Sequence, residues 1–180
     1  MTHTCNSSLC IGIDFGGVLS IHDSANIGGQ EHRSTAINVI NSLESLKILK
    51  LQGHQLYINS FCGKSRAIET KHAINEQVSG LFEGLFFVKS KKYKGLVTKY
   101  LGCDVMIDDT LDILSDIQKA KECPNLVWFT GDPTFNDKRP APEGITVCDT
   151  WEQIVKFCAT LKPSSVSNTL VSLKSKIHDV

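Results

Sequence analysis

The 180-residue sequence lacks an apolar run of the roughly 18 to 20 residues that a membrane-spanning helix needs, so no transmembrane segment is expected. It also lacks an excess of charge, because 19 basic residues balance 19 acidic ones. Proteins that bind nucleic acid or membrane surfaces usually carry a basic excess, so neither partner is indicated. The first ten residues, MTHTCNSSLC, lack the basic segment and apolar core of a signal peptide. These absences predict a globular, cytoplasmic protein.

Cysteine pairs with metal-binding or redox spacing are absent as well. The seven cysteines include no C-x-x-C pair, and their number is odd. Their spacing therefore predicts neither a zinc site nor a complete disulfide framework. Several cysteines lie inside apolar stretches, such as LGCDVMI (101–107). We expect reduced thiols that act as small core residues in a reducing compartment.

Short apolar runs alternate with helical patterns along most of the chain. The predicted strands are 9–14, 55–60, 84–90, 103–109, 125–130 and 145–149. The predicted helices are 34–53, with Ser34 as N-cap and Gly53 at its end, 63–77, 94–102, 110–121 and 151–161. Continuously apolar strands that alternate with helices are typical of a parallel sheet covered on both faces. The sequence therefore predicts one doubly wound α/β domain over residues 1–162.

Two segments fall outside this alternation. Residues 16–33 contain four glycines among scattered polar residues, and we expect a loop there. Residues 163–180 shift to serine and lysine with spaced apolar residues. This tail fits either a short helix packed on the domain or a frayed end.

Three of the predicted strands end in polar residues. The first ends at Asp14, the second at Asn59 and Ser60, and the fourth at Asp108 and Asp109. Ligands of an open α/β sheet bind outside the carboxyl ends of its strands, where these side chains would meet. Clustered carboxylates repel one another unless a cation lies between them, and Mg²⁺ is the natural cation for oxygen ligands. A hydroxyl and a nearby lysine would complete a site for phosphoryl transfer, with one carboxylate as nucleophile.

At these residues the sequence resembles a known family. The segments IGIDFGGVLS (11–20) and LYINS (56–60), the lysine-rich stretch 89–94 and VMIDDTLDIL (105–114) resemble, in this order, the four motifs of the haloacid dehalogenase-like superfamily. The resemblance covers residues 9–115. It implies a Rossmann-like fold and a Mg²⁺-dependent phosphatase or phosphotransferase that acts on a phosphorylated substrate.

The resemblance also implies roles for residues of the first two motifs. Asp14 would attack phosphorus to form an aspartyl-phosphate and would also bind the metal. The backbone carbonyl of Gly16 would be a further metal ligand. Ser60, assisted by the backbone N–H groups of Phe61 and Cys62, would hold the phosphoryl oxygens.

The last two motifs would supply the cation and the other acids. Lys94 is the best match for the family's lysine, with Lys92 as the alternative, and would neutralise charge on Asp14 and the phosphate. Asp108 would bind the metal, and Asp109 would bind it directly or through water. Asp112, one helical turn later, would either support the site or be a surface charge.

The sequence departs from the family's phosphatases at Gly16, where they usually carry a second aspartate. That acid protonates the leaving group and then activates water, and glycine offers no side chain for either step. His22 or Asp23 in the following loop could substitute. Without a substitute, the chain would be an impaired relative that binds Mg²⁺ and a phosphorylated ligand or a protein partner.

Other branches fit the residues less well. Dehalogenases of the family need no metal, so the acid pair at 108–109 argues against that chemistry. A signalling receiver domain also places acids, a hydroxyl and a lysine around Mg²⁺, but its acid pair normally follows the first strand. The gaps between the motifs are too short for a sizeable cap domain, so we expect an open site. Members of the family without a cap often act on large substrates or use a partner chain as the lid, so the resemblance implies either a large substrate or a homo-oligomer.

Overall fold

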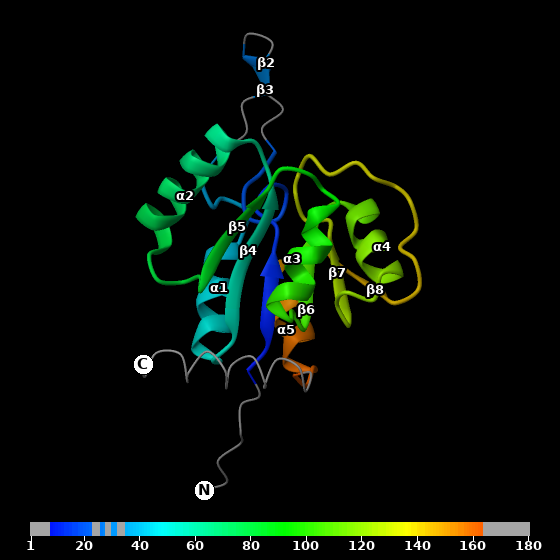
Figure 1. The fold of residues 1–180 in the computed structure, drawn as a ribbon. Coiled ribbons are helices and arrows are strands. Elements are labelled where there is room, and N and C mark those ends of the chain that lie inside the picture. Colours follow the sequence, from blue (N-terminus) through cyan, green and yellow to red (C-terminus); the bar gives the residue numbers. More distant parts are fainter. Residues whose placement is uncertain (1–7, 23–25, 28–29, 32–34, 164–180) are drawn as a thin grey trace, which may run out of the picture.

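The computed structural model describes residues 8–22, 26–27, 30–31 and 35–163 (Figure 1). Six strands form one parallel sheet in the order β5-β4-β1-β6-β7-β8. The strands are β1 (Cys10–Ile13), β4 (Gln55–Phe61), β5 (Gly84–Val88), β6 (Val105–Asp108), β7 (Asn125–Phe129) and β8 (Ile145–Cys148). The predicted parallel sheet is therefore confirmed.

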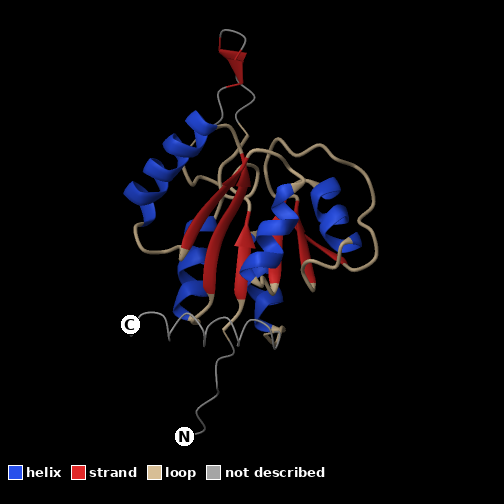
Figure 2. Ribbon diagram, viewed as in Figure 1, coloured by secondary structure: helices blue, strands red, loops and turns tan. Residues whose placement is uncertain are grey.

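Helices cover both faces of this sheet (Figure 2). They are α1 (Ser42–Leu51), α2 (Lys64–Val78), α3 (Tyr93–Leu101), α4 (Leu111–Lys119) and α5 (Trp151–Ala159). Buried side chains of α1, α2 and α5 share one apolar cluster with the sheet, whereas those of α3 and α4 belong to a second cluster. The two clusters lie on opposite faces, which confirms the doubly wound α/β architecture.

The central strand β1 has the sequence CIGI, and all four residues are buried. Ile11 and Ile13 belong to the cluster under α1, α2 and α5, and Cys10 belongs to the cluster under α3 and α4. This alternation follows from the two-residue period of a strand. Because β1 lies between β4 and β6, the chain builds one half of the sheet on each side of it. Ligands of such sheets bind at the carboxyl end of this switch point.

The first helix begins later than the sequence indicates. The prediction started it near Ser34, which lies outside the described residues, but α1 begins at Ser42. The backbone N–H groups of Asn38 and Val39 instead donate to the carbonyl of Leu19 at 2.9 and 3.0 Å. This segment therefore fastens the loop that follows β1, and the apolar spacing reflects that packing. The helix ends before Gly53, as expected.

The segment 16–33, expected to be a loop, contains a short antiparallel pair. The pair is β2 (Asn26–Ile27) with β3 (Gln30–Glu31), and it projects beyond the carboxyl end of the sheet (Figure 1). Two-residue strands are too short to produce a sequence pattern. Between β4 and β5 the chain forms only α2. Within the described ranges, no insertion is large enough to be a cap domain.

The helices of the described ranges include none that is both long and apolar enough to cross a membrane. Residues 164–180 of the predicted tail, as well as Asp23, lie outside the described residues.

Candidate active site

Asp14 directly follows β1 at the carboxyl end of the sheet. Its backbone N–H donates to the carbonyl of Ile107 at 2.9 Å, which continues the pairing of β1 with β6. One carboxylate oxygen, Oδ1, accepts the N–H of Phe15 at 2.8 Å. The register of the sheet places Asn59 and Asp108 on either side of Asp14. The strand-end residues that the sequence singles out therefore lie together.

The loop after Asp14 turns back tightly. The N–H groups of Leu19 and Ser20 both donate to the carbonyl of Phe15, and Gly17 donates to the carbonyl of Ser20 at 2.8 Å. Gly17 has a φ of 74°, in the left-handed region that favours glycine. A Cβ at this position would also collide with the carboxylate of Asp109. This glycine therefore lets the loop approach the acids closely.

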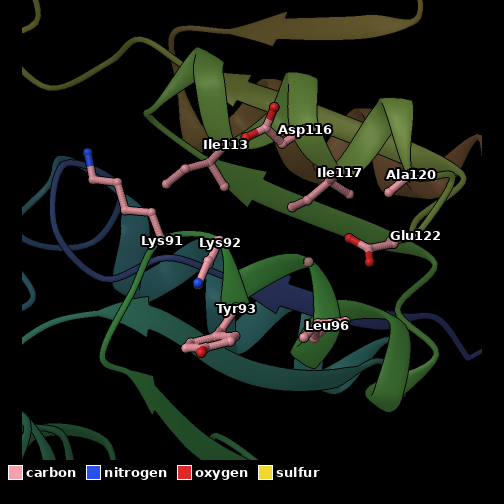
Figure 3. Close-up of a pocket in the computed structure, with 10 residues that line it drawn as sticks. Lys91, Lys92, Tyr93, Leu96, Ile113, Asp116, Ile117, Ala120 and Glu122 are labelled. Atoms are coloured by element: carbon pink, nitrogen blue, oxygen red, sulfur yellow. The ribbon is translucent and has the colours of Figure 1, made fainter.

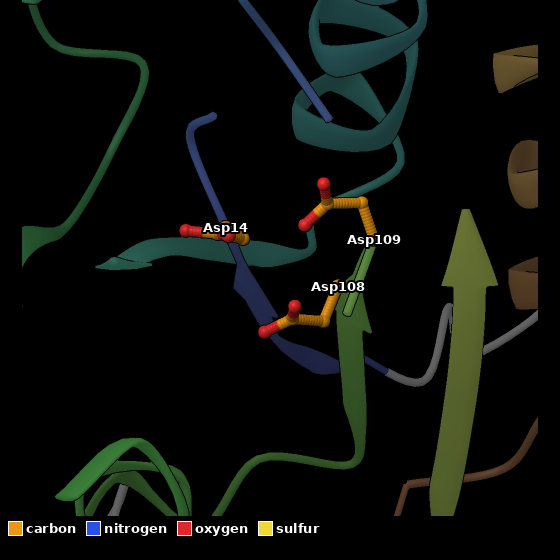
Figure 4. Close-up of side chains that lie close together, drawn as sticks. All are labelled: Asp14, Asp108 and Asp109. Atoms are coloured by element: carbon orange, nitrogen blue, oxygen red, sulfur yellow. The ribbon is translucent and has the colours of Figure 1, made fainter. Parts of the chain in front are cut away.

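Strand β6 ends at Asp108, and Asp109 follows it directly, beside Asp14. Asp108 is fully buried, and its Oδ1 accepts the N–H of Thr110 at 2.9 Å. The backbone carbonyl of Asp109 accepts the indole N–H of Trp128 at 2.9 Å, which fixes the end of this strand against β7. Figure 4 shows the three carboxylates of Asp14, Asp108 and Asp109 converging from β1 and β6. One oxygen of each lies within 4.8 Å of the others.

Lys94 brings a positive charge into this group of acids. Its side chain is fully buried, and its Nζ lies 3.1 Å from Oδ2 of Asp14 and 2.5 Å from Oδ2 of Asp108. The backbone carbonyl of Lys94 accepts the side-chain N–H of Asn59 at 2.9 Å, which ties the first turn of α3 to β4. Lys92 is exposed, and its Nζ lies over the ring of Tyr93. Of the two lysines that the sequence leaves open, the structure brings Lys94 to the acids.

The electrostatics of the site favour an additional cation. Burial, together with the charges of Asp14 and Asp108, raises the pKa of Asp109 to about 8. Burial also raises the pKa of Asp108 to about 6, although Lys94 acts in the opposite direction. Burial alone would lower the pKa of Lys94, but the two carboxylates outweigh it and raise that pKa. One lysine therefore does not compensate three acids.

The donor set fits Mg²⁺. Apart from its ion pair with Lys94, the buried Oδ2 of Asp108 has no hydrogen-bond partner among the described residues. The available donors are carboxylate oxygens, and octahedral Mg²⁺ ligands lie about 3 to 4 Å apart. Asp14, Asp108 and Asp109 approach that spacing. The geometry is therefore compatible with one small divalent cation shared by β1 and β6.

The phosphate-binding group expected at the end of β4 needs one correction. Ser60 is buried at this strand end, next to β1. The N–H of Cys62 donates to the carbonyl of Val88 at 3.2 Å, so it is not available to a phosphate as the sequence suggests. Successive N–H groups along a strand point to opposite sides, so that of Phe61 is directed toward β1. Ser60 and Phe61 remain as the candidate phosphate contacts.

His22 lies next to the position where a side chain of residue 16 would begin. An ideal Cβ on Gly16 would be 3.3 Å from Nε2 of His22. The other ring nitrogen, Nδ1, lies 3.4 Å from Oδ2 of Asp132 and 3.8 Å from Oδ2 of Asp109. His22 was one of two substitutes suggested by the sequence, whereas Asp132 was missed. The available signal was an acid just after a predicted strand, in FTGD (129–132).

Asp112 lies apart from these groups. Its exposed side chain pairs with the guanidinium of Arg139 at 2.6 Å, so of its two expected roles it has that of a surface charge. Phe135 packs edge-on against Trp128, with ring centroids 5.5 Å apart. It helps to line a pocket of about 220 Å³ that includes Asp109, one of the three clustered acids. The other lining residues include His22, Asp109, Asp132, Thr134 and Arg139.

A larger hollow of about 400 Å³ lies between α3 and α4 (Figure 3). Lys91, Tyr93 and Leu96 line one side, and Ile117 and Glu122 line the other. None of the three clustered acids is among the described residues that line it. Size alone therefore does not identify the reactive site.

Comparison with solved structures finds this fold in proteins of low sequence identity. D,D-heptose 1,7-bisphosphate phosphatase from B. bronchiseptica, in complex with magnesium and phosphate, is 12% identical with a TM-score of 0.62, covering 84% of this chain and 98% of that one. The Burkholderia thailandensis enzyme is 12% identical with a TM-score of 0.59, covering 86% and 100%. An L-2-haloacid dehalogenase is 9% identical with a TM-score of 0.59, also covering 86% and 100%. No family model and no curated protein matches the sequence.

Proposed function

The chain has the haloacid dehalogenase-like fold, and from this premise we propose that it is a Mg²⁺-dependent phosphatase or phosphotransferase that acts through an aspartyl-phosphate on Asp14. The observation that supports this most directly is the position of Lys94. A fully buried ammonium contacts Asp14 and Asp108 at the carboxyl end of the central strand. Burying three charged side chains together costs free energy. Such clusters are more typical of functional sites than of purely structural ion pairs.

Each residue of the site has a distinct task in this proposal. Asp14 attacks phosphorus, with Oδ1 held by the N–H of Phe15 and Oδ2 beside Lys94. Lys94 offsets the negative charge of the nucleophile and of the approaching phosphate. Ser60 and the N–H of Phe61 donate to phosphoryl oxygens. These groups are fixed by the sheet and by α3, so the protein orients the reactants with little reorganisation.

The metal would be held by Asp14, Asp108 and Asp109, together with the backbone carbonyl of Gly16. When bound, Mg²⁺ supplies neutralisation of charge on the phosphoryl oxygens. The B. bronchiseptica phosphatase of similar fold binds magnesium and phosphate, which supports this assignment. The substrate would be a phosphate ester that enters an open site, since no cap is present in the described ranges.

We also infer a cytoplasmic location from the thiols. All six cysteines of the described part of the chain are free, and five of them are buried. Burial raises the pKa of both Cys123 and Cys158 to about 12, so these two thiols stay protonated and unreactive. Such cysteines suit a reducing compartment.

One observation favours a second candidate function. Gly16 has no side chain to protonate a leaving group, so the same site could bind Mg²⁺ and a phosphorylated ligand without turning it over. This candidate predicts Mg²⁺-dependent ligand binding and no release of phosphate.

Phosphate release from aryl and alkyl monoesters with Mg²⁺ separates the two candidates. We expect turnover by the wild type, a loss of at least about 10³-fold in Asp14→Asn, and an acid-stable phosphoryl adduct on Asp14 after rapid quenching. Asp116→Asn is the control, because Asp116 is an exposed acid on α4. Full activity in Asp14→Asn would overturn the proposed nucleophile. Mg²⁺ binding without release from any ester would establish the binding protein.

A further inference from the structure

We propose that His22, oriented by Asp132, performs the proton transfers for which Gly16 has no side chain. This inference rests on the proposed phosphatase function. It gives the reaction a proton donor for the leaving group and a base for water. His22 is the catalytic residue of the pair, and Asp132 is a positioning residue.

The imidazole of His22 lies close to residue 16. Nε2 of His22 is 3.3 Å from the position of a Cβ on Gly16, so the ring lies directly next to the point where a side chain at residue 16 would start. Residue 16 follows the proposed nucleophile by two positions, in the tight loop beside the acids. The imidazole is one-third exposed, which leaves it open to a substrate and to water. The position suits a group that must reach the leaving oxygen.

The buried carboxylate of Asp132 holds His22 in place. Oδ2 of Asp132 accepts the backbone N–H of His22 at 2.9 Å and lies 3.4 Å from its Nδ1. Asp132 is nearly fully buried, and its other oxygen accepts the N–H and the hydroxyl of Thr134 at 2.7 and 2.8 Å. A carboxylate next to Nδ1 favours one orientation of the ring, in which Nε2 lies next to residue 16. Asp109 is the other acid facing the ring, at 3.8 Å from Nδ1.

A pocket lies next to the imidazole of His22. The pocket of about 220 Å³ is lined by His22, Asp109 and Phe135, among other residues. A leaving group in this pocket would place its oxygen between the phosphorus and the imidazole. The imidazole therefore lines a pocket that also includes Asp109, one of the three clustered acids.

The proposed chemistry balances in two steps. In the first, a carboxylate oxygen of Asp14 forms a bond to phosphorus, and the bond from phosphorus to the ester oxygen breaks. The departing oxygen keeps the electron pair and takes the proton from Nε2, so an alcohol leaves. In the second, Nε2 accepts a proton from water as the water oxygen bonds to phosphorus. The bond to Asp14 then breaks, inorganic phosphate leaves, and the aspartate and the protonated imidazole are restored.

The leaving group provides the test. His22→Gln keeps most of the volume of the side chain but cannot transfer a proton. With phenyl phosphate, whose leaving group needs a proton, we expect kcat/KM to fall by about 10² to 10⁴-fold. With 4-nitrophenyl phosphate, whose leaving group needs none, the loss stays below about tenfold. The variant also shows a burst of 4-nitrophenolate equal to the enzyme, because water attack on the phosphoryl-enzyme is slow.

Asp132→Asn tests the positioning residue with the same substrates. We expect a loss that is larger for phenyl phosphate than for 4-nitrophenyl phosphate, with KM nearly unchanged. If Asp132 had only a structural role, its substitution would lower kcat/KM for both substrates by the same factor. An equal loss for both substrates, in this variant and in His22→Gln, would overturn the inference.

A substitution at residue 16 gives an independent test. The backbone of Gly16 is outside the left-handed region, so it accepts a side chain there. In the wild type, Gly16→Asp would press against the imidazole and is expected to give no gain. In the His22→Ala background the space is open, so Gly16→Asp should restore phenyl phosphate turnover at least tenfold over His22→Ala alone. A gain in the wild-type background and none in the His22→Ala background would overturn the inference.

The experiments separate a wrong role for His22 from a wrong function for the whole site. If no ester is hydrolysed by the wild type with Mg²⁺ and no adduct forms on Asp14, the proposed function is wrong, and the inference falls with it. If the wild type turns over and depends on Asp14, but His22→Gln shows no selectivity for the leaving group, the inference alone is wrong.

Discussion

The ammonium of Lys94 lies 2.5 Å from the carboxylate of Asp108, and both side chains are fully buried. Asp14 is the second acid that contacts this ammonium, at 3.1 Å. The pair connects the first turn of α3 with the end of β6, so it joins two parts of the site. Removing one partner of this pair costs more free energy than replacing both, because the remaining charge stays buried without an opposite charge.

We therefore expect Lys94→Met to destabilise the protein by about 3–5 kcal/mol. The reason is that Asp108 would keep its burial and lose its nearest opposite charge. Urea unfolding without metal measures the effect. The control is Lys92→Met, which changes an exposed lysine and should alter stability by less than about 0.5 kcal/mol. The double variant Lys94→Met/Asp108→Leu should recover much of the loss. Equal stability of Lys94→Met and the wild type would contradict the ion pair.

The raised pKa of Asp109 makes the stability of the metal-free protein depend on pH. In the unfolded chain the pKa is about 3.9, whereas in the folded chain it is about 8. Between these values the folded state holds more protons than the unfolded state, so the free energy of unfolding falls as pH rises. We expect a loss of at least about 1 kcal/mol between pH 5.5 and 8.5. Asp108, with a pKa of about 6, contributes in the lower part of this window.

Mg²⁺ should reverse this trend, because it binds the deprotonated carboxylates. Thermal unfolding with and without Mg²⁺ should show a larger stabilisation at pH 8.5 than at pH 5.5. Asp109→Asn should remove most of the pH slope, whereas Asp116→Asn, an exposed acid, should keep it. If the free energy of unfolding of the metal-free protein rose with pH across this range, the prediction would be wrong. Asp109 would then be ionised in the folded state, with its negative charge neutralised by another group.

The site acids could be predicted from the sequence because of a property of parallel sheets. Carboxyl ends of the strands share one edge, so Asp14 and Asp108 had to approach if their strands were neighbours. The choice between Lys92 and Lys94 depends instead on where α3 begins. The stretch KKYK has no capping residue that marks the start, and the link from Asn59 to the carbonyl of Lys94 is visible only in three dimensions.

Other features depend on contacts distant in sequence. His22 and Asp132 are 110 residues apart, in glycine-rich or proline-containing loops without periodicity. The late start of α1 follows from backbone hydrogen bonds of Asn38 and Val39 to Leu19, which leave no trace in local helical spacing. Sequence periodicity indicates which face of a helix or strand is buried. The contacts named above are made by backbone and polar groups, so periodicity does not predict them.

The tight loop beside the acids leads to a prediction at Gly17. Gly17→Ala should lose about 1–2 kcal/mol through its positive φ and should also displace the carboxylate of Asp109. We expect its Mg²⁺ affinity to fall at least tenfold, as measured by calorimetry. Gly53→Ala is the matched control, because Gly53 has a φ of 87° and a Cβ there would meet no described atom within 4 Å. It should lose similar stability and keep its Mg²⁺ affinity. Equal Mg²⁺ affinity of the two variants would contradict the close approach.

The amide of Asn59 leads to the last prediction. It is fully buried and donates to the carbonyl of Lys94 at 2.9 Å and to the hydroxyl of Thr98 at 3.0 Å. Asn59→Ala should cost about 1–3 kcal/mol and let the first turn of α3 shift relative to β4. Because Lys94 moves with that turn, we expect kcat/KM for phosphate esters to fall about 10 to 100-fold.

The matched control for Asn59→Ala is Asn125→Ala. Asn125 also donates its side-chain amide N–H to a backbone carbonyl, that of Asp104, at 2.8 Å. It lies where β7 begins, at the amino ends of the strands and therefore far from the site. It should lose about 1 kcal/mol in urea unfolding and keep full activity. If both variants lost stability and activity in the same proportion, the loss in Asn59→Ala would reflect general destabilisation. A selective loss of activity in Asn59→Ala would instead show that β4 positions Lys94 through this hydrogen bond.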